Sequence, residues 1–228
     1  MNPELTYSLP AYQTASGAAD IMMHTMERYF TPTDTDTSLT DRIAEGLMLS
    51  VRDAAQVAVK DPENYDARAT LMWAGSLSHN GLTGAGRVSD FATHKIEHEL
   101  GGMFDVAHGA GLAAVWGSWA RYVYKTNPGR FAQFGEKVFG IDASQTSDSD
   151  ITDTVLASIT AWETWCHSID MPTTLTELAF IQPMPKSRKW LRNAFRQKRT
   201  HWLLPAVDER RYCGNPANGE IHQPDSKH

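Results

Sequence analysis

Apolar residues recur at helical spacing along most of the first 178 residues. Between residues 39 and 60, Ile43, Leu47 and Val51 follow one another at intervals of four, with alanines in the neighbouring turns. This spacing places the apolar side chains on one face of a helix. The same pattern predicts further helices over residues 11–30, 65–82, 109–125, 130–140 and 151–170. Because no strands recur at regular spacing, the expected fold is all-α, a helical bundle of about seven or eight helices.

Several segments are expected to interrupt the helical pattern. Residues 1–10 end in Leu9-Pro10, and a residue before proline favours extended backbone, so an extended connector is predicted there. The helix that starts near Ser89 is expected to break at Gly101-Gly102. Residues 81–88, GLTGAGRV, have no strand pattern before them and no Gly-Lys-Ser/Thr after them. They therefore predict a loop that helps to shape a substrate pocket, rather than a phosphate-binding loop.

Histidines are concentrated in one stretch, HKIEHELGGMFDVAHGAG, from His94 to Gly111. His94 and His98 are four residues apart, so a helix places both on one face. His108 follows the glycine pair, so the elements on either side of the bend can direct imidazoles into one space. Neutral imidazole is a ligand for zinc, iron, copper and nickel. The stretch therefore indicates a metal site, with purely structural histidines as the alternative.

A second pair of candidate ligands lies upstream, where Asp20 and His24 have the same spacing of four in a predicted helix. One carboxylate and three imidazoles would then be available from Asp20, His24, His94 and His108. Such a set leaves room for a substrate oxygen, as catalytic metal sites do. His98 would then lie beside the ligands, either supporting one of them or transferring a proton.

Two long motifs resemble the iron-containing alcohol dehydrogenase family, most closely its butanol-dehydrogenase-like branch. They are NPELTYSLPAYQTASGAADIMMHTMERYF at residues 2–30 and THKIEHELGGMFDVAHGAGLAAVW at residues 93–116. The family holds its metal with an aspartate and three histidines, which by motif position fall on Asp20, His24, His94 and His108. The resemblance also implies that His98 lines the active site near the substrate.

The resemblance implies hydride exchange between a primary alcohol or aldehyde and NAD(P), with Fe(II) or Zn(II) as the metal. It extends from about residue 2 to residue 178 and corresponds to the family's helical C-terminal domain. The N-terminal nucleotide-binding α/β domain of the family is expected to be absent, so NAD(P)-binding residues are not assigned. Turnover by this chain alone is therefore expected to be weak. Whether the chain forms a homodimer is left open.

Composition sets further limits on the function. The chain has 228 residues, 41% of them hydrophobic, a net charge of −6 and two cysteines that are distant in sequence. These properties favour a reduced, cytoplasmic protein and disfavour nucleic acid as the main partner. No apolar run reaches the roughly 18 residues of a membrane span. His79 is predicted to be a packed or capping histidine rather than a ligand.

The end of the chain differs from the rest. After a helical metal-binding domain at residues 1–178, residues 179–228 are basic, contain MPKSRKWLRNAFRQKRTHW, and have no resemblance to the family. They are expected to form an atypical, poorly folded tail, which a change of reading frame would explain. Three alternative functions follow: a catalytically inactive metal-binding helical module, a nucleic-acid-binding protein acting through the tail, and a non-functional gene fragment.

Overall fold

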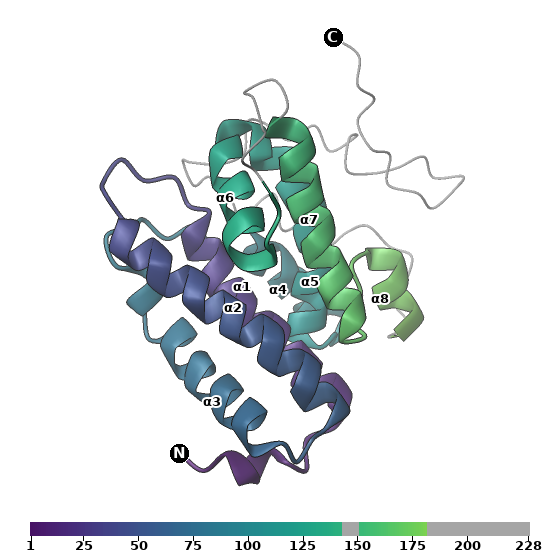
Figure 1. Ribbon diagram of the computed structural model, residues 1–228. Coiled ribbons are helices and arrows are strands. Elements are labelled where there is room, and N and C mark those ends of the chain that lie inside the picture. Colours follow the sequence, from purple (N-terminus) through teal and green to yellow (C-terminus); the bar gives the residue numbers. More distant parts are fainter. Residues whose placement is uncertain (143–150, 182–228) are drawn as a thin grey trace, which may run out of the picture.

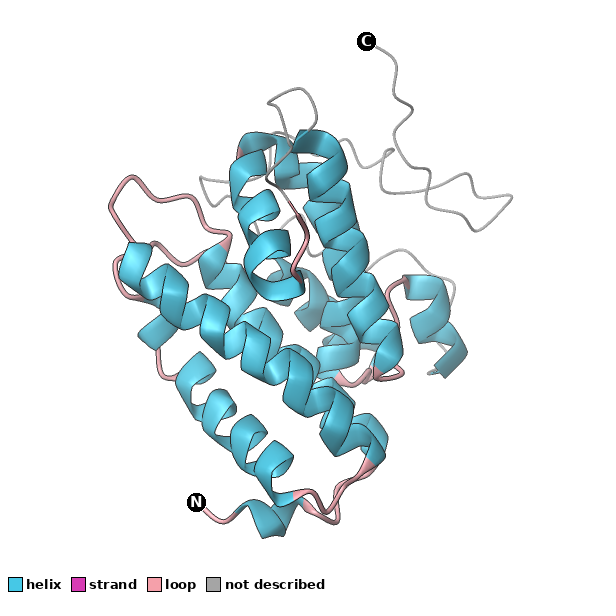
Figure 2. Ribbon diagram, in the orientation of Figure 1, coloured by secondary structure: helices cyan, strands magenta, loops and turns pink. Residues whose placement is uncertain are grey.

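A computed structural model describes residues 1–142 and 151–181, and within them all regular structure is helical (Figures 1 and 2). The described α-helices are α1 (Ala11–Tyr29), α2 (Ser38–Lys60), α3 (Tyr65–His79), α4 (Ala92–Phe104), α5 (His108–Val123), α6 (Pro128–Phe139), α7 (Ile151–Ser168) and α8 (Leu175–Ile181). Three short 3-10 helices are η1 (Pro3–Thr6), η2 (Leu82–Gly84) and η3 (Tyr124–Thr126). The predicted all-α bundle is confirmed, with eight α-helices in these residues.

Helix α1 lies at the centre of the bundle and packs against α2, α3 and α5. In Figure 1, α2 and α3 run side by side along one side of the molecule, and α6 and α7 pack together at the other end. Helix α5 joins the two halves because it contacts α1, α4, α7 and α8. The one helix that carries Asp20 and His24 is therefore in direct contact with the helix that begins at His108.

The core is filled by methionines and large aromatic residues. Met22, Met23 and Met26 of α1 are fully buried, which fits their flexible, apolar side chains. Trp116 and Trp162 are also fully buried, with ring centroids 5.4 Å apart. Each such side chain stabilises the fold by about 1.5–3 kcal/mol when it leaves water. The core thus holds α1, α5 and α7 at fixed positions, on which the site depends.

The prediction of a helix break at Gly101-Gly102 is wrong. Helix α4 continues through both glycines to Phe104, and the bend occurs at Asp105, whose φ of 53° is left-handed. Glycine costs a helix interior only about 1 kcal/mol, which the packing of α4 against α5 outweighs. The absence of a side chain at Gly101 also leaves room for Glu97, because a Cβ there would lie 3.3 Å from Glu97 Oε1.

The connector at residues 1–10 is not extended throughout, which corrects a second prediction. Pro3–Thr6 forms a 3-10 helix, and the Asn2 side chain accepts a hydrogen bond from the backbone N–H of Glu4. Asparagine is a favoured N-cap and proline a favoured first helical residue, so a short helical turn forms at Pro3, whereas the preference before Pro10 acts only on Leu9.

The predicted tail falls mostly outside the described residues, which end at residue 181. Helix α8 crosses the predicted domain boundary at residue 178 and continues to Ile181. The predictions of a poorly folded tail and of nucleic-acid binding concern residues 179–228, of which residues 182–228 lie outside the described part. None of the helices in the described part is long and apolar enough to cross a membrane.

Candidate metal centre

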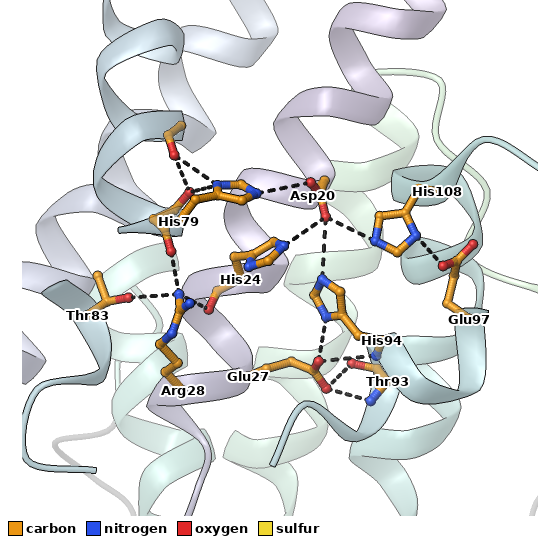
Figure 3. Close-up of polar contacts among 12 residues, drawn as sticks. Asp20, His24, Glu27, Arg28, His79, Thr83, Thr93, His94, Glu97 and His108 are labelled. Carbon is orange, nitrogen blue, oxygen red and sulfur yellow. Dashed lines mark hydrogen bonds and ion pairs between the residues drawn. The ribbon is translucent and has the colours of Figure 1, made fainter. Parts of the chain in front are cut away.

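The site forms where α1, α4 and α5 meet (Figure 3). On α1, Asp20 and His24 are one turn apart and project from the same face. His94 comes from the first turn of α4, and His108 is the first residue of α5. The bend at Asp105 turns the chain between these two helices, so that residues on both can face α1.

One oxygen, Asp20 Oδ1, is the common point of the cluster. It lies 3.6 Å from Nε2 of His24, 3.5 Å from Nε2 of His94 and 3.5 Å from Nε2 of His108. Metal–ligand bonds of about 2.0–2.2 Å in a tetrahedral site would hold ligand atoms roughly 3.3–3.6 Å apart. Each of the three histidine Nε2 atoms therefore lies at the distance from Asp20 Oδ1 that two ligands of one cation would have.

Two of these atoms are buried without a hydrogen-bond partner. Among the described residues, Asp20 Oδ1 and His94 Nε2 make no hydrogen bond, although each is shielded from solvent. A buried polar atom left unsatisfied costs about 1–3 kcal/mol. A cation bound by both atoms would remove that cost, so the donor set fits a divalent metal.

The candidate ligands fall into three overlapping groups in the described residues. The ligand atoms lie within 4.8 Å of one another in Asp20, His94 and His108, in Asp20, His24 and His79, and in Glu97, His98 and His108. Asp20 belongs to the first two groups, and its two oxygens face different histidines. The arrangement thus brings the three predicted histidine ligands to Asp20 and adds His79.

His79 has two sets of contacts. Its Nδ1 lies 2.8 Å from the carbonyl oxygen of Gly75 in the last turn of α3, which fits the predicted capping role. Its Nε2 lies 3.4 Å from Asp20 Oδ2, and its ring packs on that of His24 at 3.8 Å. No pattern in the sequence indicates this second contact, because it depends on how α3 packs against α1.

His98 lies beside the cluster, one turn after His94 on α4. Its exposed ring stacks on that of His108 with centroids 5.4 Å apart, and the centroid of the His94 ring is 6.3 Å away. This position next to two candidate ligands, on the solvent side, is where a proton-transfer residue would lie.

Burial and neighbouring charges shift the pKa values of three residues in the cluster. Burial lowers the pKa of His24 to about 3, against the opposing effect of Asp20. Burial also lowers the pKa of His94, but the neighbouring carboxylates of Asp20 and Glu27 outweigh it and raise that pKa to about 9. For Asp20, burial raises the pKa and the surrounding histidines lower it further than burial raises it. Asp20 is therefore ionised and His24 neutral near pH 7, while a metal competes with a proton on His94.

The glycine-rich segment at residues 81–88 packs one turn from the cluster. Arg28 Nη1 donates to the carbonyl oxygens of His24, at 2.9 Å, and of Ser78, and lies 3.4 Å from Thr83 Oγ1 (Figure 3). A Cβ at Gly84 would lie 2.9 Å from Arg28 Cδ. Arg28 thus links this loop to α1 next to His24. That the loop shapes a substrate pocket stays a prediction.

Two buried acids that the sequence interpretation did not single out complete the surroundings. Glu27 Oε2 lies 2.5 Å from His94 Nδ1, and Glu97 Oε2 lies against His108 Nδ1. Both glutamates had a detectable signal, since Glu27 is seven residues after Asp20 and Glu97 three after His94. At helical spacing each falls on the same face as a ligand.

The fold and the cluster define a helical domain with a candidate metal centre. A family model described as "Fe-containing alcohol dehydrogenase family, C-terminal" matches residues 14–202, and the chain belongs to this family. The resemblance inferred from the two motifs is thus confirmed. The match continues past residue 178, where the boundary with the tail was predicted.

Named relatives show which activities occur among similar proteins. The NADH-dependent butanol dehydrogenase B of Clostridium acetobutylicum is 41% identical over 143 residues, which are 62% of this chain and 36% of that protein. The NADPH-dependent aldehyde reductase YqhD of Escherichia coli is 37% identical over 177 residues, 78% of this chain and 44% of that protein.

Solved structures of such proteins have the same fold. The substrate- and cofactor-free form of E. coli YqhD has a TM-score of 0.77 at 33% identity, covering 88% of this chain and 51% of that one. The NADH-dependent butanol dehydrogenase A of Thermotoga maritima has a TM-score of 0.76 at 32% identity, covering 85% of this chain and 46% of that one. The chain therefore spans about half, or less, of the length of these relatives.

Proposed function

We propose that Asp20, His24, His94 and His108 hold one divalent metal ion, and that the site serves the interconversion of a primary alcohol and an aldehyde with NAD(P). The observation that carries the proposal is the position of three Nε2 atoms within 3.6 Å of Asp20 Oδ1. The named relatives, a butanol dehydrogenase and an aldehyde reductase, support the substrate class. One carboxylate and three imidazoles suit Fe(II) and Zn(II) alike.

The bound cation and the side chains around it have separate roles in this proposal. A bound cation supplies Lewis acidity toward the oxygen of the alcohol or aldehyde. Neutral His24 and ionised Asp20 present lone pairs without first losing a proton. His98, exposed and stacked on His108, transfers a proton between the substrate hydroxyl and solvent at its ring nitrogens.

Metal content tests the ligand assignment. The purified chain, incubated with Zn(II) or Fe(II) and desalted, is expected to retain about one ion per chain by elemental analysis. His94→Ala removes a buried ligand and is expected to retain far less, since losing one of four ligands costs roughly 3 kcal/mol, or more than 100-fold in affinity. His167→Ala is the matched control, because His167 pairs with Glu177 away from the site. Equal metal content in all three proteins would contradict the assignment.

Turnover tests the catalytic part of the proposal. Dinucleotides are usually held at a turn between a strand and a helix, and all regular structure in residues 1–142 and 151–181 is helical. We therefore expect the metal-loaded chain to reduce butanal with NADH or NADPH slowly, well below the roughly 1–1000 per second of ordinary enzymes. Turnover within that ordinary range would contradict the expectation. Metal binding with no turnover at all would leave a catalytically inactive metal-binding module.

A further inference from the structure

Two buried carboxylates lie just outside the proposed ligand set. The side chains of Glu27 and Glu97 are each only 1% exposed. Burying a carboxylate is costly unless it is paired or hydrogen-bonded. Each of these two lies against Nδ1 of one candidate ligand, Glu27 at His94 and Glu97 at His108 (Figure 3).

Glu27 fixes which nitrogen of His94 carries a proton. Its Oε1 accepts from the backbone N–H of Thr93 at 2.5 Å and from the Thr93 hydroxyl, and its Oε2 accepts from the backbone N–H of His94 at 3.1 Å. A carboxylate that receives these donors is an acceptor throughout. The proton in its contact with His94 Nδ1 therefore belongs to the ring, and the lone pair of the neutral imidazole is on Nε2, facing Asp20.

Glu27 also determines where His94 lies. The N-cap residue of α4, Phe91, makes no side-chain capping bond. The Glu27 carboxylate, which comes from α1, satisfies free N–H groups in the first turn of α4 and carries the charge that a helix N-terminus favours. The acid that holds the His94 ring thus also anchors the helix that bears it.

Glu97 has fewer partners than Glu27. Its Oε2 contacts His108 Nδ1, and neither of its two oxygens makes a hydrogen bond within the described ranges. The space it occupies depends on Gly111, where a Cβ would lie 2.7 Å from Glu97 Cγ and 2.8 Å from Oε1. The second glycine of the Gly-Ala-Gly sequence after His108 therefore makes room for this carboxylate.

We propose that Glu27 and Glu97 are positioning residues, each of which holds the Nδ1–H of one histidine so that Nε2 of both is directed at a cation beside Asp20. The two contacts form a series from helix to helix: α1 orients the ligand on α4, and α4 orients the ligand on α5. Carboxylates in this position fix the tautomer and increase the basicity of metal-bound imidazole. This inference rests on the proposed function, since it assigns these residues to the same metal site.

Glu97 gives the cleaner experiment, because Glu27 also caps α4. Glu97→Gln keeps an oxygen that can accept the Nδ1–H, whereas Glu97→Leu removes every acceptor at similar size. Affinity for Co(II) and Zn(II) is expected to fall in the order wild type, Gln, Leu, with a total loss of about 10–100-fold. The visible spectrum of the Co(II)-loaded protein, which reports ligand geometry, is expected to change in the Leu variant and to return toward wild type in the Gln variant.

Glu45→Gln is the matched control. Glu45 is another buried glutamate, but it accepts hydrogen bonds from Tyr29 and Gln133 away from the cluster. This variant is expected to bind Co(II) with wild-type affinity and spectrum. A loss of the same size in Glu45→Gln would show a general effect of buried glutamates and would overturn the proposal.

The outcomes separate this inference from the function on which it rests. If the wild-type chain binds neither metal, the proposed function fails. If wild type binds and both Glu97 variants match it in affinity and spectrum, only the positioning role fails. Imidazole ¹⁵N chemical shifts give a readout without metal: His108 is expected to be protonated at Nδ1 in wild type and to shift toward the Nε2–H tautomer in Glu97→Leu, and an unchanged tautomer would contradict the proposal.

Discussion

Replacing Gly109 by alanine is expected to destabilise the chain by about 3 kcal/mol and to impair metal binding. A Cβ at this position would lie 1.9 Å from the backbone carbonyl oxygen of Ser16 and 2.7 Å from its carbonyl carbon. These backbone atoms belong to α1 and have no rotamer through which to move away. The first turn of α5 must therefore separate from α1, and this turn carries His108 while α1 carries Asp20.

Gly17→Ala is the control for Gly109→Ala. Gly17 is exposed on α1 next to Ser16, and a Cβ there would meet nothing within 4 Å. Alanine favours the helix over glycine by about 1 kcal/mol, so this variant is expected to be slightly more stable than wild type. Urea unfolding measures both effects, and zinc titration measures the change at the site. An unchanged urea midpoint for Gly109→Ala would show that the contact between α1 and α5 is looser than the structure indicates.

The sequence was sufficient for those parts of the site that depend on helical periodicity. Asp20 and His24, or His94 and His98, share a face in any α-helix, and the helices that carry them are defined by apolar spacing. The meeting of the two segments was inferred from the types of residue and from the family resemblance. In the structure the two segments meet at Asp20, whose Oδ1 lies within 3.6 Å of three histidine Nε2 atoms.

The remaining features depend on packing between segments that are far apart in the sequence. His79 reaches Asp20 because α3 packs on α1, and Glu27 is a cap for α4 although it lies on α1. The helix break predicted at Gly101 and Gly102 is wrong for the same reason. The local preference of two glycines for a break is outweighed by the contact of α4 with α5. Local propensity is a weak guide where tertiary contacts contribute several kcal/mol.

Asp20→Ala is expected to abolish the stabilisation of the chain by zinc. An ion that binds only the folded chain stabilises it by about 4 kcal/mol at a concentration 1,000 times the Kd. For a domain of this size that corresponds to a rise in Tm of roughly 8–16 °C. Asp20 is decisive because its Oδ1 is the atom that three histidine Nε2 atoms share, and the variant leaves only imidazoles at that point.

Thermal unfolding with and without excess zinc measures this effect, and the quantity compared is the zinc-induced shift rather than Tm itself. That choice matters because removing a carboxylate among three histidines changes the stability of the metal-free chain as well. Asp53→Ala is the control, since Asp53 is exposed and pairs with Arg52 outside the cluster; it is expected to retain the full shift. If Asp20→Ala gains as much from zinc as wild type does, the ion that stabilises the chain is bound elsewhere. Asp20, His24, His94 and His108 would then be a partly buried polar cluster rather than a metal site.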